Sequence, residues 1–245
     1  MKVLAGQIKL ESRLFLRDKG ELFWALAFPV FFIVLFGLVY QGESWDGMPP
    51  ITYIAPGIIT MAVMVTCIMN TTMGVVSDRG KGIFRRLSLT PLKRQTLIGG
   101  QIVTRYLIIL VQALILIAIG VIFFKVTIGG NYFLFWGALT IGALAFLAMA
   151  FALTTLIKSE KSAPPVAMTS FFILLFLGGC LFPIDIMPEF VQYIYKVLPS
   201  AHLNEALRMI AIDEVGFSRV WPEFLKLGGW LVVLSAISVK FFKWE

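Results

Sequence analysis

The residues able to do chemistry are few, and their spacing does not suit catalysis. The sequence has two cysteines, Cys67 and Cys180, and one histidine, His202. No Cys-x-x-Cys or Cys/His pair has the spacing of metal ligands. We therefore expect two buried free thiols, a histidine at the surface or at a helix cap, and no metal or cofactor in this chain.

The closest approach to a nucleotide site lies between Gly74 and Gly82. A phosphate loop requires Gly-x-x-x-x-Gly-Lys followed by Ser or Thr. Here Gly80-Lys81 is followed by Gly82, and Val75 stands where the first glycine belongs. The segment does not match a phosphate loop, so we expect no catalytic residue and no ATPase activity in the chain itself.

The composition predicts that the chain lies in a membrane. Apolar residues make up 59% of the 245 positions and charged residues 14%, against about 25% charged residues in a soluble protein. The formal charge of +7 is divided among short segments between apolar runs. That pattern favours contact with membrane lipid and a role in topology over a nucleic-acid-binding face.

Six apolar segments are long enough to span a bilayer, which takes about 20 helical residues to cross about 30 Å of hydrocarbon. They are residues 22–40, 53–76, 97–124, 132–157, 165–182 and 225–242. Residues 1–21 carry apolar side chains at helical spacing with basic ones between them, which predicts an amphipathic helix in the membrane interface. We expect an all-α integral membrane protein, a single transmembrane domain over 1–245.

Basic residues predict the topology. Lys and Arg number five in 1–21, seven in 76–105, two in 158–164 and two at the C-terminal end, 16 in all, against five in the other connecting segments. The positive-inside rule then puts both termini in the cytoplasm.

No charged side chain lies in the middle of a predicted span. Arg105 and Lys226 lie near span ends, where long side chains can reach the interface. A charge at the bilayer centre costs at least about 2.5–3.5 kcal/mol and is kept mainly in ion or proton pathways. Its absence disfavours a gradient-driven secondary transporter. A membrane-embedded lipid-processing enzyme, the other alternative, would need several reactive side chains near an interface.

The largest loop on the predicted cytoplasmic side covers residues 78–91. It combines apolar Phe84 and Leu87 with basic Arg85 and Arg86, and Thr90-Pro91 should end a short helix. An apolar tip with a basic collar suits docking on a soluble partner. A basic loop that only sets the topology is the alternative.

Two other segments suggest contacts. Prolines divide residues 183–212 into two short amphipathic helices, which we expect either to re-enter the outer leaflet or to lie on the surface. The second span has a stripe of small and mildly polar residues, a composition that favours helix–helix contact in lipid. The stripe is a candidate conduit or dimer interface, or packs within one subunit: Thr60, Met64, Cys67, Asn70, Thr71 and Gly74.

Several motifs in order resemble the type-2 ABC transporter permease family over nearly the whole chain. They are the segment Met69–Gly100 with Leu-Ser-Leu-Thr-Pro-Leu-Lys-Arg at 87–94, then Leu181-Phe182-Pro183, Met187-Pro188 and Leu198-Pro199 leading to Leu207-Arg208. In that family the cytoplasmic loop carries a coupling helix that contacts the ATPase. The matching positions here are Asp78, Arg79, Gly82, Phe84, Arg85, Arg86, Leu87 and Pro91, with Asp78 where many members have glutamate.

The resemblance implies the transmembrane subunit of an ABC exporter of the drug, lipid or polysaccharide type. Its partners would be a second permease subunit, identical or related, and two copies of a nucleotide-binding ATPase that holds ATP and Mg. Together with the uncharged spans, it implies a hydrophobic or amphipathic substrate such as a drug, a lipid or a lipid-linked glycan. We expect a bacterial inner or plasma membrane location.

Overall fold

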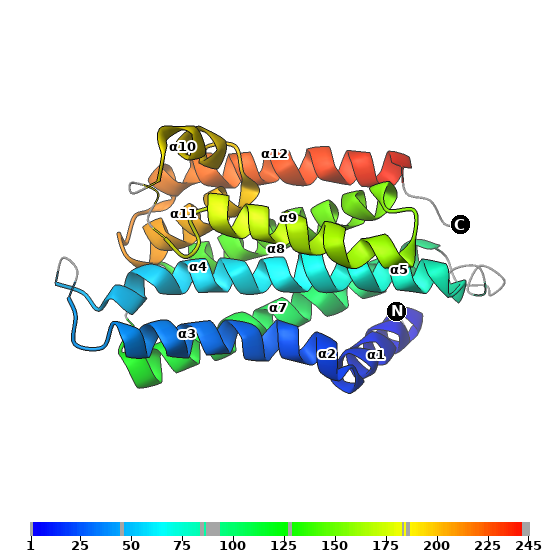
Figure 1. The fold of residues 1–245 in the computed structure, drawn as a ribbon, viewed down its shortest axis with the longest axis horizontal. Coiled ribbons are helices and arrows are strands. Elements are labelled where there is room, and N and C mark those ends of the chain that lie inside the picture. The colour runs from blue at the N-terminus through cyan, green and yellow to red at the C-terminus, as the bar shows by residue number, and fades with distance from the viewer. Residues whose placement is uncertain are drawn as a thin grey trace.

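Residues 2–44, 47–83, 86, 94–126, 129–182, 184 and 187–241 are described by the structure, a computed structural model. Every regular element in these ranges is helical. The long helices run side by side in one elongated bundle (Figure 1).

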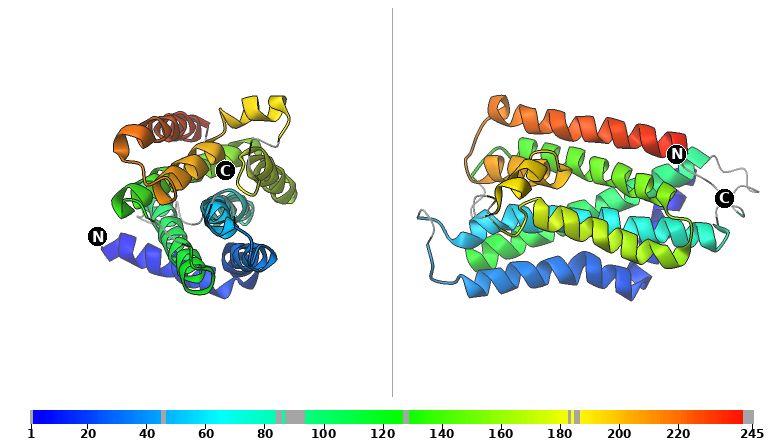
Figure 2. Two further views of the ribbon diagram at one scale, coloured as in Figure 1. Left: turned by 90° about the vertical axis from the view of Figure 1, so that its left-hand side faces the viewer. Right: turned by 45° about the horizontal axis from the view of Figure 1, so that its top comes forward.

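The N-terminal helix is separate from the first span. α1 (Lys2–Arg17) stops before Asp18, whose carboxylate accepts hydrogen bonds of 3.0 Å from the backbone N–H groups of Gly20 and Glu21. Such a cap begins a new helix, which continues through α2 (Lys19–Leu22), the π-helical η1 (Phe23–Ala27) and α3 (Phe28–Val39). Seen along the bundle in Figure 2, α1 lies across the direction of the other helices, as an interfacial helix would.

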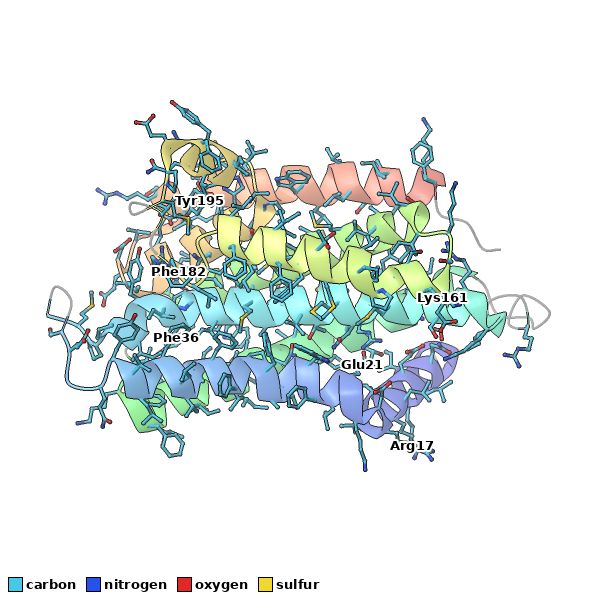
Figure 3. All side chains as sticks on the ribbon, in the orientation of Figure 1. Arg17, Glu21, Phe36, Lys161, Phe182 and Tyr195 are labelled. Carbon is cyan, nitrogen blue, oxygen red and sulfur yellow. The ribbon has the colours of Figure 1, made fainter. Side chains whose placement is uncertain are left out.

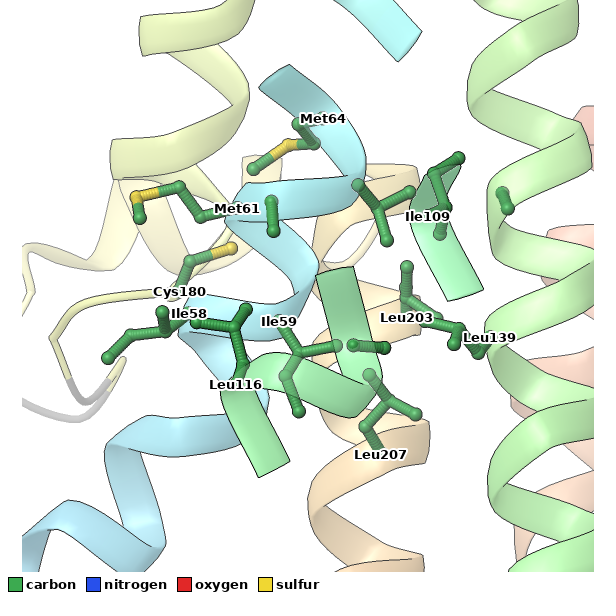
Figure 4. Packing of buried hydrophobic residues seen from close by; sticks show 14 of the residues in the cluster. Ile58, Ile59, Met61, Met64, Ile109, Leu116, Leu139, Cys180, Leu203 and Leu207 are labelled. Carbon is green, nitrogen blue, oxygen red and sulfur yellow. The ribbon is translucent and has the colours of Figure 1, made fainter. Parts of the chain in front are cut away.

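The second span is the central helix of the bundle. α4 (Pro50–Met64), the π-helical η2 (Val65–Thr71) and α5 (Thr72–Gly80) form one helical segment of 31 residues, and 94% of its most apolar stretch is buried. Its apolar side chains meet those of α7 (Arg94–Phe124), α8 (Tyr132–Leu156) and α11 (Pro199–Ala211). Figure 4 shows part of this core, a cluster of buried side chains that includes Met61, Met64, Ile109 and Leu203.

Five described helical segments are long and apolar enough to cross a membrane: those from Lys19, Pro50, Ile98 and Tyr132, and α12 (Phe217–Phe241). α12 packs along α8, and the Ser238 hydroxyl donates to the carbonyl of Ala148 at 2.9 Å. It begins eight residues before the apolar run at 225–242, because hydropathy marks the lipid-facing part of a helix and not the more polar turns at its start.

The predicted span 165–182 forms a shorter helix, α9 (Ala163–Leu177), followed by turns at Gly178–Phe182. At about 1.5 Å per residue it is about 22 Å long, less than the roughly 30 Å of hydrocarbon. Its first residue packs with Val76 and Ile157, whereas the carbonyl of Leu174 accepts a hydrogen bond of 2.9 Å from Ser200 of α11. α9 thus carries the chain from one end of the bundle toward the other, although it is shorter than the fifth span predicted at 165–182.

The two ends of the bundle differ in character. We call them the α5 end, where α1 lies and α5 and α12 finish, and the α11 end, where α10 (Glu189–Tyr195) and α11 lie (Figure 1). In Figure 3, Arg17, Glu21 and Lys161 lie toward the α5 end, and Phe36, Phe182 and Tyr195 toward the α11 end. The η3 turn (Glu160–Ser162) also belongs to the α5 end.

The two short helices before the last span behave differently. α11 is enclosed by the bundle, and Ala201, Ala206 and Leu207 are fully buried. α10 keeps to the surface, where Phe190 and nearby Val197 are largely exposed and Val191 is its buried residue. Small side chains allow α11 to approach its neighbours closely, as small residues do between helices in lipid.

Candidate functional site

The last turn of α5 is joined to two neighbouring helices just before the chain enters the loop. Asp78 accepts a long hydrogen bond of 3.5 Å from the side-chain amide of Gln101 in α7. Arg79 donates to the carbonyls of Thr154, at 3.2 Å, and Ile157 at the end of α8. Carbonyls at a helix C-terminus carry partial negative charge, so a guanidinium there is stabilising. Side-chain hydrogen bonds therefore connect the last turn of α5 to both α7 and α8.

A tight turn follows α5. The backbone N–H of Lys81 donates to the carbonyl of Ser77 at 2.9 Å, and that of Gly82 donates to the carbonyl of Arg79 at 3.0 Å. Gly82 has a φ of +66°, a conformation that favours glycine. Beyond it, the Arg86 guanidinium donates to the carbonyl of Lys81 at 3.1 Å. The other predicted coupling residues lie outside the described residues: Phe84, Arg85, Leu87 and Pro91.

α1 is seated on α7 beside this turn. A Cβ added to Gly100 would lie 2.4 Å from Cγ of Gln7, so the two helices approach closely at that glycine. Gln7 donates to Glu11 at 3.1 Å. Burial raises the pKa of Glu11 above its usual range, while Arg105 and the amides of Gln7 and Gln101 act in the opposite direction.

An ion pair between Glu21 and Arg105 connects the start of the first span to α7, with both side chains largely buried. The side-chain amide of Asn70 donates to the carbonyl of Glu21 at 3.4 Å and so adds the second span. We expected that Arg105, near a span end, can reach the interface; the structure adds a carboxylate partner, which the sequence analysis did not predict. Oppositely charged residues near the ends of the first and third predicted spans are a sequence signal that would have indicated this pair.

These contacts define a polar belt around the α5 end, made of Glu11, Glu21, Asp78, Gln101 and Arg105. It joins α1, α2, α5 and α7 at the level where the loop leaves the bundle. Asp78 belongs both to this belt and to the predicted coupling residues.

The stripe on the second span packs inside this single subunit. Thr60, Met64, Cys67, Asn70 and Thr71 are buried, and Gly74 is partly buried. The Cys67 thiol lies 3.7 Å from the carbonyl of Ala143. This arrangement corresponds to the alternative in which the stripe packs within one subunit. A role in a conduit or a dimer interface stays a prediction and would require the surrounding helices to separate.

A buried glutamine connects the two π-helical segments. Gln112 of α7 accepts from the Thr66 hydroxyl in η2 at 2.9 Å and donates to the carbonyl of Ala25 in η1. The widened π turn leaves backbone carbonyls available, and such turns recur at functional sites. The sequence reasoning missed this link, although a lone glutamine inside an apolar span was a usable signal.

His202 is buried, which corrects the expectation of a surface or cap residue. Its Nδ1 lies 2.7 Å from Glu223 of α12, and Lys226 donates to the same carboxylate at 2.8 Å. Because α11 is enclosed by the bundle, its histidine is removed from water and needs a hydrogen-bond partner there. Among the described residues, no group of three or more His, Cys, Asp or Glu side chains is placed to hold a metal ion.

The fold and the apolar helices define a multi-pass integral membrane protein in which polar side chains connect the helices at the α5 end. Residues 7–212 match the ABC-2 type transporter family, and the chain belongs to that family.

Relatives include transport permeases. The chain is 24% identical to the putative transport permease YvfS of Bacillus subtilis over 97% of this chain and 96% of that protein. It is 28% identical to ABC transporter G family member 20 of Dictyostelium discoideum over 77% of this chain and 26% of that protein. It is 21% identical to the probable multidrug ABC transporter permease YbhR of Escherichia coli over 69% of this chain and 46% of that protein. The chain therefore spans nearly all of one relative and less than half of the other two.

Proposed function

We propose that this chain is the membrane-spanning half of an exporter that moves a hydrophobic or amphipathic substrate with ATP hydrolysed by a separate subunit. The observation that carries the proposal is the family match over residues 7–212, which includes the loop and both flanking helices. The arrangement of Asp78 and Arg79 supports it, because both hold the exit of α5 to neighbouring helices.

In this proposal the 78–91 loop docks on the ATPase at the cytoplasmic face. ATP and Mg belong to that partner, present in two copies, and a second permease subunit, identical or related, completes the path. A displacement of the loop would pass through Asp78 to Gln101 and through Arg79 to the end of α8. The polar belt would carry it to α1, because Glu11 lies beside Arg105 and Gln101.

The substrate class is argued from the spans. The described core around the second span is built from apolar side chains with a few hydroxyl and amide groups. Such walls do not compensate the lost hydration of an ion, whereas they suit an apolar or amphipathic molecule. YbhR carries a multidrug name, and we extend that class to drugs, lipids and lipid-linked glycans here.

The location and topology belong to the same proposal. We place the protein in a bacterial plasma membrane with both termini in the cytoplasm and with α9 and the turns after it completing a sixth crossing. Support comes from Arg17, Lys161 and Lys240 lying at the α5 end together with the finishes of α5 and α12.

The test is to copurify and reconstitute the complex. A tagged chain from native membranes should bring down an ATPase with a complete phosphate loop, identified by mass spectrometry. In liposomes the complex should move ethidium or a short-chain fluorescent phospholipid only with hydrolysable ATP. Export that continues without the ATPase and collapses with a protonophore would instead favour a gradient-driven transporter.

A further inference from the structure

Two neighbouring hollows at the α5 end adjoin each other outside the polar belt. The first is an apolar groove of about 360 Å³ between α8, α9 and α12, which we call the chain groove. Its walls include Met149, Leu153, Ser170, Ile173, Leu234 and Ile237. The second, also about 360 Å³, is a polar pocket lined by Arg79, Lys158 and Glu160, which we call the head pocket. Thr155, in the last turn of α8, lines both, so they meet there.

The head pocket has an excess of positive charge. Arg79 uses two N–H groups on the carbonyls of Thr154 and Ile157, and a guanidinium has five N–H donors. Within the described part of the chain, neither Arg79 nor Lys158 has a carboxylate oxygen within 4.0 Å. Glu160 is the acid of the pocket, and one of its oxygens already accepts from the Ser77 hydroxyl at 2.7 Å. An anion would find unused donors here.

The positions of the two hollows along the bundle suit an amphipathic molecule, with its apolar part in the chain groove and its polar part in the head pocket. The chain groove lies along the parts of α8 and α12 that approach the α5 end, and the head pocket lies beyond the last turn of α8. From Met149 to Leu156 the helix rises about 10 Å at 1.5 Å per residue, well within the length of one acyl chain. Apolar walls below a basic rim at the membrane boundary are the arrangement that recognises anionic lipid.

We propose that these hollows form a binding site for one anionic phospholipid of the surrounding leaflet, with its phosphate at Arg79 and Lys158 and an acyl chain in the chain groove. A second copy of the chain is a poorer occupant. A twofold axis through this groove would bring the same two cations of both copies together, and like charges repel. Because Arg79 also holds α5 to α8, the bound lipid would reinforce the joint at the loop exit.

The first test compares headgroups by native mass spectrometry on the purified full chain in detergent. Palmitoyl-oleoyl phosphatidylglycerol should bind at least about fivefold more tightly than phosphatidylcholine with the same chains, the effect expected of one basic side chain. Lys158→Gln should weaken phosphatidylglycerol by about fivefold and leave phosphatidylcholine unchanged. The matched control Lys19→Gln, an exposed lysine at the same end, should change neither.

The second test concerns the acyl chain. Ile237→Trp fills the chain groove from a partly exposed position and should reduce retention of phosphatidylglycerol at least about tenfold, because losing the burial of about two methylene groups of the acyl chain weakens binding by that factor. Val239→Trp, on a largely exposed position of the same helix, is the control and should leave binding unchanged. Thermal unfolding of each variant checks that it is folded.

Equal binding of the two lipids to the unaltered chain, or equal effects of the two lysine variants, would overturn the site. Competition by glycerol phosphate alone, at the concentration where the lipid binds, would show a simple anion site and contradict the role of the groove. The measurement needs neither ATP nor transport, so its failure would leave the proposed exporter function untouched.

Discussion

At the residue scale, Gly57 lets the backbone of α4 pass close to a neighbouring backbone carbonyl. A Cβ added to Gly57 of α4 would lie 1.7 Å from the carbonyl oxygen of Cys180, in the turns that follow α9. No flexible side chain can yield there. We predict that Gly57→Ala lowers the free energy of unfolding by about 1–3 kcal/mol, the usual cost of overpacking. Thermal unfolding followed by fluorescence-detected size exclusion would measure it.

Gly99→Ala is the matched control. A Cβ at Gly99 meets nothing within 4 Å, and alanine is favoured over glycine inside a helix by about 0.5–1 kcal/mol. This variant should be as stable as the parent or slightly more so. If the two variants unfold at the same temperature, the close approach of α4 to the Cys180 turn is wrong.

The loop residues provide a second prediction. Phe84→Ala and Arg86→Glu should each abolish export while the protein stays folded in the membrane. Truncating a buried aromatic anchor commonly costs at least about 2 kcal/mol of binding, and reversing a rim charge adds repulsion. Arg86 is exposed, and among the contacts described its side chain bonds to the carbonyl of Lys81 alone, so its replacement should spare the fold.

Copurification of the ATPase with each variant is the measurement, beside ATP-dependent transport in liposomes. Arg17→Glu, on an exposed residue of α1, serves as the charge-reversal control and should retain the partner. Normal ATPase binding and normal export in both loop variants would mean that the 78–91 segment only sets the topology.

At this scale the sequence indicated which residues stand at the loop exit but not what they contact. Asp78 and Arg79 were singled out by a resemblance, and their partners Gln101 and Thr154 come from helices that follow later in the chain. His202 was expected at the surface or at a helix cap, whereas it is buried beside Glu223, and the partner of Arg105, Glu21, was not predicted. A partner distant in sequence is set by packing, which periodicity in one segment does not report.

At the element scale, the helices follow from hydropathy except at their ends. The helices at the first four apolar runs agree with those runs to within a few residues, because burial in lipid requires all backbone groups to bond within the helix. The boundary between α1 and α2 depends instead on one capping carboxylate, Asp18. The enclosed position of α11 and the shortness of α9 depend on neighbours that one segment alone does not reveal.

The orientation of these elements is a third prediction. Cysteines introduced as Val3→Cys and Trp244→Cys should resist a membrane-impermeant maleimide in intact cells and react in permeabilised ones, because the basic segments hold both termini inside. Ser44→Cys, in the exposed turn after α3, should react in intact cells.

The two native thiols provide a convenient background for that experiment, because Cys67 and Cys180 are free and buried. The parent protein should therefore label weakly and serve as the control. Labelling of the termini but not of position 44 in intact cells would reverse the topology and move the 78–91 loop to the wrong side for an ATPase.

At the scale of the whole molecule, the fourth prediction is that the chain alone neither binds nor hydrolyses ATP. Its one glycine-lysine step lacks the residues of a phosphate loop, and in the structure Gly80 and Lys81 close α5 and enter a turn. Purified protein in detergent should release no phosphate above a heat-inactivated sample. Hydrolysis that persists through further purification, in proportion to this chain, would contradict the division of labour proposed here.

The sequence by itself determined the solvent of this protein and its helical class, because a 59% apolar chain with few charges has to satisfy its backbone inside lipid. The order of its motifs indicated the family. Local signals were enough for that. Only the tertiary structure decided that the second span is the central helix, that Glu21 meets Arg105, and that the chain groove and the head pocket adjoin at Thr155. Each of these depends on helices far apart in the chain, and in lipid the hydrophobic effect does not choose between helix faces. Close packing and the pairing of buried polar groups choose instead.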